Sequence, residues 1–296
     1  MISIKPMRIA IASGKGGTGK TLVATSLFYA LQRERIEATL VDCDAEEPNV
    51  MSFFQGQLEK SAEVMQRVPV IDENKCTYCG KCHEYCNYKA IFILPPMKVI
   101  KVMEDLCHGC GACTVACEYG AIVEKDVSLG QVNQYAVSGN SKIIESRMNV
   151  GVYSPVRVIK AAINESNNHR VVIMDSPPGT SCPFIQTVAR ADFVILVTEP
   201  TPFGLSDLKQ SVETLKTMGK SCGVIINRAG LGNDAIYGYL HDQGIPLLLE
   251  IPFDREIASA YSKGKIVAAE KRYLQTLLLT VFNIIVKKYG NSHHQR

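Results

Sequence analysis

Short runs of apolar residues alternate along the chain with segments in which apolar side chains recur every three or four positions. The runs are typical of short strands that are covered on both faces of a sheet. They predict strands near residues 7–13, 38–42, 171–175, 193–198, 222–227 and 247–251. The periodic segments, such as residues 21–32 and 155–164, predict helices between these strands. The alternation predicts an α/β fold with a doubly wound, mainly parallel sheet.

A cysteine-rich segment near residues 68–126 interrupts this alternation. It holds eight of the chain's 11 cysteines, in two quartets with the spacing Cys-x2-Cys-x2-Cys-x3-Cys. The quartets are Cys76, Cys79, Cys82 and Cys86, then Cys107, Cys110, Cys113 and Cys117. The repeated spacing indicates an internal repeat, and it is the bacterial ferredoxin pattern for two 4Fe–4S clusters.

Crossed ligation is expected for this pattern. Short turns let three cysteines of one quartet surround a cluster, and the fourth ligand comes from the other quartet. The predicted ligand sets are Cys76, Cys79, Cys82 and Cys117 for one cluster, and Cys86, Cys107, Cys110 and Cys113 for the other. Asn87 and Glu118 stand where the bacterial pattern usually has proline, which leaves the number of ligands unchanged.

Zinc and disulfide bonds are the alternatives for these cysteines. Structural zinc sites use two separated pairs of ligands, which three evenly spaced cysteines and a fourth fit poorly. Disulfides are rare in proteins that are not exported, and residues 1–12 show no signal sequence. The spacing therefore favours iron–sulfur clusters, and we expect a cytoplasmic protein.

A glycine-rich loop follows the first predicted strand and precedes the first predicted helix. Its residues are Gly14, Lys15, Gly16, Gly17, Thr18, Gly19, Lys20 and Thr21. In this context the loop matches a P-loop, whose backbone N–H groups surround the phosphates of a nucleotide. We expect Lys20 to contact the β- and γ-phosphates and Thr21 to bind Mg²⁺.

The additional lysine of this loop, Lys15, makes the chain similar to the MinD/ParA/Mrp group of ATPases, which carry a deviant Walker A motif. The resemblance implies a homodimer that forms on ATP binding, with Lys15 reaching the nucleotide of the partner subunit. It implies catalytic roles for Lys15, Lys20 and Asp44. Asp44 would position the attacking water, and Asp42 would support the magnesium–phosphate region.

Later segments carry further motifs of the same group. Asp175 ends the predicted strand at residues 171–175 and resembles the Walker B aspartate, which holds Mg²⁺ through water. By the same resemblance Gly179 would sense the γ-phosphate, and Asn227 with Arg228 would bind adenine. Pro252 belongs to a segment that would close over the base.

The resemblance covers nearly the whole chain and is greatest to MinD-type ATPases with an inserted ferredoxin domain. It implies a discontinuous P-loop ATPase domain at residues 1–67 and 127–296, with a ferredoxin-like domain inserted at residues 68–126. Residues 127–152 are polar and predict a hairpin or a connecting region.

Composition adds little about partners. The 296 residues carry a net charge of +3, which is too small to indicate nucleic-acid or membrane binding by itself. There is no arginine-rich stripe, and the longest apolar run, near residues 277–286, is too short to span a bilayer. We therefore expect neither a nucleic-acid partner nor membrane attachment.

These features predict an ATP-hydrolysing iron–sulfur protein that uses ATP, Mg²⁺ and two 4Fe–4S clusters. Its ATP-gated dimer would deliver electrons to an unidentified partner protein, or mature that protein's metal cluster. Two alternatives stay open: a spatial-organisation ATPase of the MinD or ParA kind with the clusters as a redox sensor, and an iron–sulfur cluster carrier. Cys182 is a candidate ligand of a cluster bridging the dimer, although such a cluster needs two cysteines per subunit.

Overall fold

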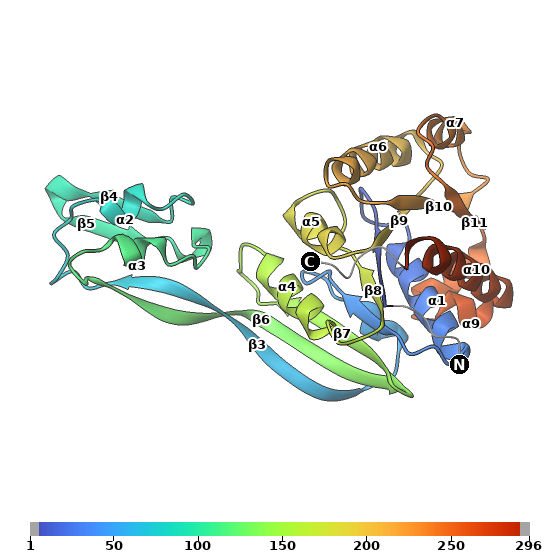
Figure 1. Ribbon diagram of the computed structural model, residues 1–296, viewed down its shortest axis with the longest axis horizontal. Coiled ribbons are helices and arrows are strands. Elements are labelled where there is room, and N and C mark those ends of the chain that lie inside the picture. Colours follow the sequence, from blue (N-terminus) through green and yellow to red (C-terminus); the bar gives the residue numbers. More distant parts are fainter. Residues whose placement is uncertain (1–5, 291–296) are drawn as a thin grey trace. The chain divides into compact units, whose positions relative to one another are not determined.

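The computed structural model describes residues 6–290, which form two compact units (Figure 1). The core unit comprises the described residues up to Ala62, Val132–Arg147, and those from Val156 onward. The cysteine-rich unit comprises Glu63–Gln131 and Met148–Pro155. The chain therefore passes from the core unit to the cysteine-rich unit twice, after Ala62 and after Arg147, and returns at Val132 and at Val156.

A nine-stranded sheet has the strand order β11-β10-β9-β1-β8-β2-β7-β6-β3. Its strands are β1 (Met7–Ala12), β2 (Thr39–Asp42), β3 (Gln57–Ile71), β6 (Ile122–Ser138), β7 (Ser141–Met148), β8 (Val171–Asp175), β9 (Phe193–Thr198), β10 (Cys222–Ala229) and β11 (Leu247–Pro252). The neighbouring pairs from β11 to β7 are all parallel. All six strands predicted from the apolar runs are present, and the mainly parallel sheet is confirmed.

The helices of the core unit cover both faces of this sheet. They are α1 (Lys20–Arg33), α4 (Val156–Glu165), α5 (Cys182–Ala189), α6 (Pro202–Thr217), α7 (Ala235–Asp242), α8 (Arg255–Ser262), α9 (Val267–Glu270) and α10 (Arg272–Tyr289), with a 3₁₀ turn η1 (Val50–Phe53). Ile9 and Ile11 of β1 share a core with α1 and α10, and Ala10 between them is buried away from that core. Because successive strand residues face opposite sides, this burial shows a sheet that is covered twice.

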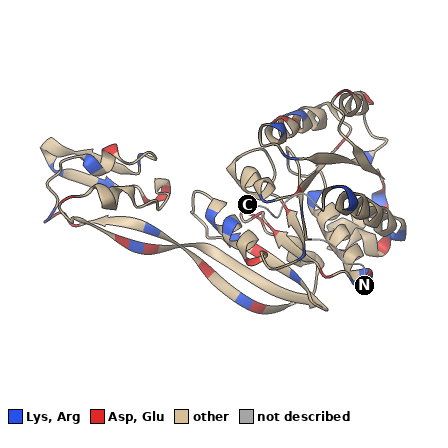
Figure 2. Ribbon diagram, in the orientation of Figure 1, with Lys and Arg blue, Asp and Glu red and all other residues tan. Residues whose placement is uncertain are grey.

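The long strand β3 is the main element that the apolar pattern does not predict. Charged residues of both signs interrupt β3 at Glu59, Lys60, Glu63 and Arg67 and β6 at residues 124–126, and Figure 2 shows blue and red bands on this long pair of strands. The hairpin predicted within residues 127–152 corresponds to the end of β6 and the whole of β7, with Gly139 in the turn at a positive φ of 55°.

The cysteine-rich unit has a small core of its own. Its further elements are α2 (Lys81–Glu84), β4 (Ile91–Leu94), η2 (Pro95–Met97), β5 (Val99–Val102), η3 (Glu104–Leu106) and α3 (Ala112–Ala116). Strands β4 and β5 pair antiparallel, with Ile91 opposite Val102. The buried residues of its core are Cys82, Ile91, Ile100, Cys113 and Ile122.

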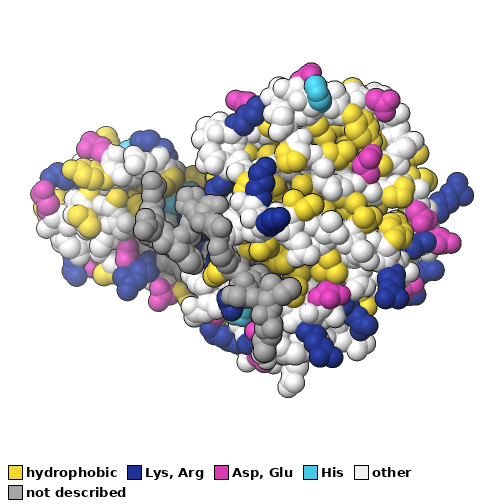
Figure 3. Space-filling view, turned by 45° about the vertical axis from the view of Figure 1, so that its right-hand side comes forward, with side chains coloured by type: hydrophobic (Ala, Val, Ile, Leu, Met, Phe, Trp, Pro, Cys, Tyr) yellow, Lys and Arg dark blue, Asp and Glu magenta, His cyan; other side chains and the backbone are white. Residues whose placement is uncertain are grey.

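The helices within residues 6–290 include no candidate for a bilayer-spanning segment. None of the helices there combines the length and the apolar character that crossing a membrane requires. On the face shown in Figure 3, basic and acidic side chains are interspersed among polar and hydrophobic ones.

Candidate functional site

The glycine-rich loop joins the buried strand β1 directly to the N-terminus of α1. Gly17 and Gly19 have positive φ angles of 77° and 99°, a conformation that glycine adopts without steric strain. Helix α1 begins at Lys20 with no side-chain hydrogen bond to cap it. Its first backbone N–H groups therefore remain available for an anion, as at other helix N-termini that bind phosphate.

The side chains of Lys20 and Thr21, at the start of α1, lie near Asp175, which ends β8. The Thr21 hydroxyl donates a hydrogen bond to Asp175 Oδ2 at 2.6 Å. The other carboxylate oxygen, Oδ1, is buried and has no hydrogen-bond partner in the described structure. A buried carboxylate oxygen of this kind, beside a hydroxyl and a phosphate-binding loop, fits a hard cation such as Mg²⁺.

Burial and the neighbouring charges shift the pKa values of Asp175 and Lys20. Burial raises the pKa of Asp175 to about 7, although Thr21 and the ammonium of Lys20 oppose the shift. Burial lowers the pKa of Lys20, and the carboxylates of Asp175 and Asp44 oppose that shift. Perturbed pKa values concentrate at functional sites because such sites hold charges away from water.

The high pKa of Asp175 predicts how stability changes with pH in the protein without nucleotide or metal. Its pKa in the folded state, about 7, lies above the ordinary value of 3.8, so ionisation of Asp175 destabilises the fold as the pH rises between these values. Asp175→Asn is expected to raise the free energy of unfolding by about 1 to 3 kcal/mol at pH 8, and by less at pH 5. Denaturant unfolding at the two pH values measures this difference. The exposed Asp242→Asn is the control, and a variant equally destabilised at both values would contradict the prediction.

Asp42 holds the loop that follows β2. Its carboxylate accepts backbone N–H groups from Asp44 at 3.1 Å, Asn49 at 2.9 Å and Val50 at 3.0 Å. Its backbone carbonyl accepts the Ser146 hydroxyl of β7 at 2.7 Å. Burial and the neighbouring Asp175 raise the pKa of Asp42 well above its usual range. Asp42 thus links the loop after β2 to the end of β7.

Asp44 lies on the loop after β2, and Gly179 lies on the loop after β8. Asp44 is half-buried, and burial is the main cause that raises its pKa, opposed by the charge of Lys20. The Gly179 N–H donates to the Ser13 carbonyl at 3.1 Å, which joins the loop after β8 to the P-loop. Gly179 has a φ of 89°, so a side chain there would strain the backbone.

The residues at the end of β10 contact the P-loop from the other side. Asn227 Nδ2 donates to the Thr18 carbonyl at 2.8 Å, and a Cβ on Gly19 would lie 2.4 Å from the same nitrogen. Arg228 has a positive φ of 56°, which is strained for a residue other than glycine. Pro252 ends β11 and is paired with Ala229, close to Asn227 and Arg228 along the sheet.

Glu199, a charged residue beside the P-loop, was not predicted from the sequence as part of the site. Glu199, directly after β9, lies 2.6 Å from Arg228 and 3.6 Å from Lys15 through its two carboxylate oxygens. Asp42 and Asp175 end buried parallel strands, and Glu199 directly follows one. Its place at the carboxyl end of the strand predicted at residues 193–198 is the signal that could have found it.

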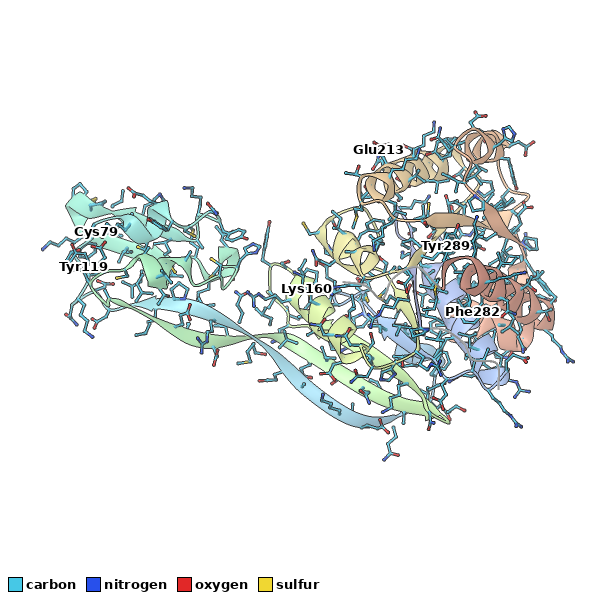
Figure 4. All side chains as sticks on the ribbon, viewed as in Figure 1. Cys79, Tyr119, Lys160, Glu213, Phe282 and Tyr289 are labelled. Carbon is cyan, nitrogen blue, oxygen red and sulfur yellow. The ribbon has the colours of Figure 1, made fainter. Side chains whose placement is uncertain are left out.

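The first predicted ligand set lines one hollow of the cysteine-rich unit. This hollow encloses about 340 Å³, partly open to solvent, and its lining includes Cys76, Cys79, Cys82 and Cys117. Tyr119 lines the same hollow and lies next to Cys79 (Figure 4). Cys117 stands in the second quartet of the sequence, yet it faces three cysteines of the first.

The second ligand set lines a separate hollow of about 370 Å³. Its lining includes Cys86, Cys107, Cys110 and Cys113. The rings of Tyr88 and His108 stack there at 3.7 Å between centroids. No cysteine of residues 6–290 forms a disulfide. In the same range no three His, Cys, Asp or Glu side chains are grouped closely enough for one metal ion. A four-iron cluster is larger than one ion, so hollows with spaced cysteines fit it better.

The backbone around the two hollows follows the internal repeat. Tyr78 and Gly109, each two residues after the first cysteine of a quartet, both have positive φ angles, of 56° and 58°. Their N–H groups donate to the sulfurs of Cys76 at 3.4 Å and Cys107 at 3.3 Å. Hydrogen bonds to ligand sulfurs are one means by which proteins adjust cluster potentials.

Comparison with known proteins agrees with the parallel sheet and the P-loop. The CobQ/CobB/MinD/ParA nucleotide binding domain matches residues 9–268. An uncharacterized protein of Methanocaldococcus jannaschii is 31% identical over 266 residues, covering 88% of this chain and 90% of that protein. An iron-sulfur cluster carrier protein of Rickettsia typhi is 22% identical over 265 residues, covering 86% of this chain and 64% of that protein. The septum site-determining protein MinD of Pyrococcus horikoshii, solved with Mg-ADP, has the same fold, with a TM-score of 0.59, 18% identity and coverage of 97% and 99%.

Proposed function

This chain belongs to the CobQ/CobB/MinD/ParA family of nucleotide-binding proteins, and we propose that it is a magnesium-dependent ATPase whose nucleotide state controls two 4Fe–4S clusters. Its output is electron delivery to a partner protein, or maturation of that protein's metal cluster. The observation that carries this proposal is the pair of hollows, each lined by the four cysteines of one crossed ligand set.

The residues in and around the P-loop would each have a role in binding or hydrolysing ATP. Lys20 would face the β- and γ-phosphates, and Thr21 with Asp175 would hold Mg²⁺. Asp44 would position the attacking water. Asn227 would bind adenine, a task that its fixed position against the Thr18 carbonyl supports. Lys15 would reach the nucleotide of a second subunit, so that ATP closes a homodimer.

The cysteine-rich unit would be a ferredoxin-like domain that holds both clusters. Bound there, they would supply one-electron transfer. Burial raises the pKa of Cys82 to about 11, so cluster binding would release its proton. A cluster carrier is the second candidate function, favoured by the similarity to the carrier of Rickettsia typhi. Crossed ligation favours retention over donation, because removal of one cluster would disturb a ligand of the other quartet.

Asp42 supplies a physical route between the two halves. Asn49 and Val50, which it holds through their N–H groups, lead through η1 into β3. Ser146, which donates to its carbonyl, comes shortly before Met148–Pro155 of the cysteine-rich unit. A nucleotide that rearranges the loop after Asp42 therefore acts on the two points, after Ala62 and after Arg147, at which the chain enters that unit.

The test is the midpoint potential of each cluster, measured without nucleotide, with ADP, and with ATP. The ATP measurement uses Asp44→Ala, which is expected to bind ATP without hydrolysing it. Since binding linkage is reciprocal, a potential that moves by about 60 mV between states corresponds to a tenfold change in nucleotide affinity. Lys20→Ala is the control, because the midpoint potentials of its clusters should not change when ATP is added. Equal potentials in all three states would refute coupling and favour the carrier function.

A further inference from the structure

Three charged side chains meet beside the P-loop, on the side away from Asp175. They are Lys15, Glu199 and Arg228. Glu199 Oε1 accepts a hydrogen bond from Arg228 Nη1 at 2.6 Å, and Glu199 Oε2 lies 3.6 Å from Lys15 Nζ. Only about 10% of the Glu199 side chain is exposed, against 33% for Lys15. One nearly buried carboxylate is thus shared by two cations at the rim of the nucleotide site.

The backbone of Glu199 is fixed by the first turn of α6. Its carbonyl accepts the Thr201 N–H at 2.8 Å, and a Cβ on Gly204 would lie 2.2 Å from the same carbonyl. The Thr201 hydroxyl in turn accepts the Gly204 N–H at 3.0 Å. These contacts fix the backbone of Glu199, and the hydrogen bond from Arg228 holds its carboxylate, so the distance between Lys15 and the carboxylate increases when the lysine moves away.

Arg228 is held by more contacts than Lys15. Its backbone N–H donates to Asn227 Oδ1 at 3.0 Å, and its Nη2 donates to the Gly17 carbonyl at 3.5 Å, in addition to the pair with Glu199. Lys15 is on a flexible stem and is paired with Glu199 at a longer distance. The Lys15–Glu199 pair is therefore the weaker link of the three-residue group and the one that can exchange partners.

We propose that Glu199 is a positioning residue that retains Lys15 within its own subunit until the triphosphate of a nucleotide in a second subunit displaces the carboxylate. This inference rests on the proposed ATP-dependent homodimer. One ammonium group cannot pair fully with the Glu199 carboxylate and with the phosphates of another subunit at the same time. Glu199 therefore sets the ATP concentration at which the dimer forms, and it disfavours dimers with ADP, which offers less negative charge.

The test measures the ATP concentration that gives half-maximal dimer, by sedimentation velocity with Mg²⁺ in the absence of oxygen. All variants carry Asp44→Ala, which prevents turnover. Glu199→Gln keeps the size of the side chain and its ability to accept from Arg228, but removes the charge. It should lower the half-maximal ATP concentration about twofold to fivefold, the range expected for a partly exposed ion pair. Glu213→Gln, an exposed change on α6, is the matched control (Figure 4).

A double-mutant comparison separates retention of Lys15 from a structural role. Glu199→Gln should not restore ATP-dependent dimerisation to a protein that carries Lys15→Ala, because its effect depends on release of that lysine. ATP affinity of the monomer should be the same with and without Glu199→Gln. If the parent protein dimerises with ATP through Lys15 but Glu199→Gln leaves the concentration unchanged or raises it, this inference alone is overturned. If the parent protein does not dimerise, both the inference and the proposed dimer are overturned.

Discussion

Lys20→Ala is expected to weaken Mg-ATP binding at least ~30-fold. Lys20 is the first residue of α1 and is largely buried, close to the carboxylates of Asp175 and Asp44. Removing one partner from a buried charge pair costs about 2 to 5 kcal/mol, and 2 kcal/mol is already close to 30-fold in affinity. Without its ammonium group, the β- and γ-phosphates would meet two carboxylates whose charge Lys20 no longer balances. Calorimetric titration of the anaerobic protein measures the change.

The matched control for this experiment is Lys160→Ala, an exposed lysine on α4 (Figure 4). It removes the same charge from the chain and should leave the affinity for Mg-ATP within about twofold. If Lys20→Ala and Lys160→Ala bind Mg-ATP equally well, the phosphates do not occupy the N-terminus of α1, and the nucleotide half of the proposal fails.

Cys117→Ser is expected to remove one cluster and spare the other, reducing the iron content from about eight to about four atoms per chain. The cluster that is lost should be the one assigned to Cys76, Cys79 and Cys82, because Cys117 lines the same hollow as these residues. Serine is a poor substitute for a thiolate, so the effect should be large. Iron and sulfide analysis with electron paramagnetic resonance of the reduced protein distinguishes the two clusters.

Cys86→Ser is the reciprocal variant and should spare the cluster that Cys117→Ser removes. Cys222→Ser, a change in β10 outside both quartets, is the control and should retain all the iron. Loss of the cluster assigned to Cys107, Cys110 and Cys113 in the Cys117→Ser protein would show that ligation is not crossed. Stoichiometric zinc with little iron in the unaltered protein would show that the cysteines serve a different metal.

The parallel part of the fold could be predicted from the sequence because its strands are covered on both faces. Residues such as Ile9, Ile173 and Ile225 must be apolar to be buried there, and the pattern reports this directly. Strand β3 is exposed along most of its length, so burial does not restrict its residues, and its charges hide it from the apolar pattern. A strand that is exposed along its length, such as β3, is for this reason harder to predict than a buried one.

The candidate site was predictable where chemistry depends on residues that are close in sequence. The P-loop and the first three cysteines of each quartet are of this kind, since a short turn brings their atoms together. The pairing of Glu199 with Lys15 joins residues that are far apart in the chain, and it depends on β9 lying beside β1. The Asp42 carboxylate accepts hydrogen bonds from three backbone N–H groups, and these bonds depend on a loop conformation that a sequence motif does not specify.

The small core of the cysteine-rich unit has a consequence for how cells would handle this protein. Two of its five buried residues, Cys82 and Cys113, are also proposed cluster ligands, so folding of the unit and acquisition of iron would be parts of one event. The core unit has its own larger interior and does not share this dependence. Iron starvation would then produce chains with an intact nucleotide-binding half and a half that proteases can cleave. Turnover of the protein would follow the iron supply, independently of any transcriptional control.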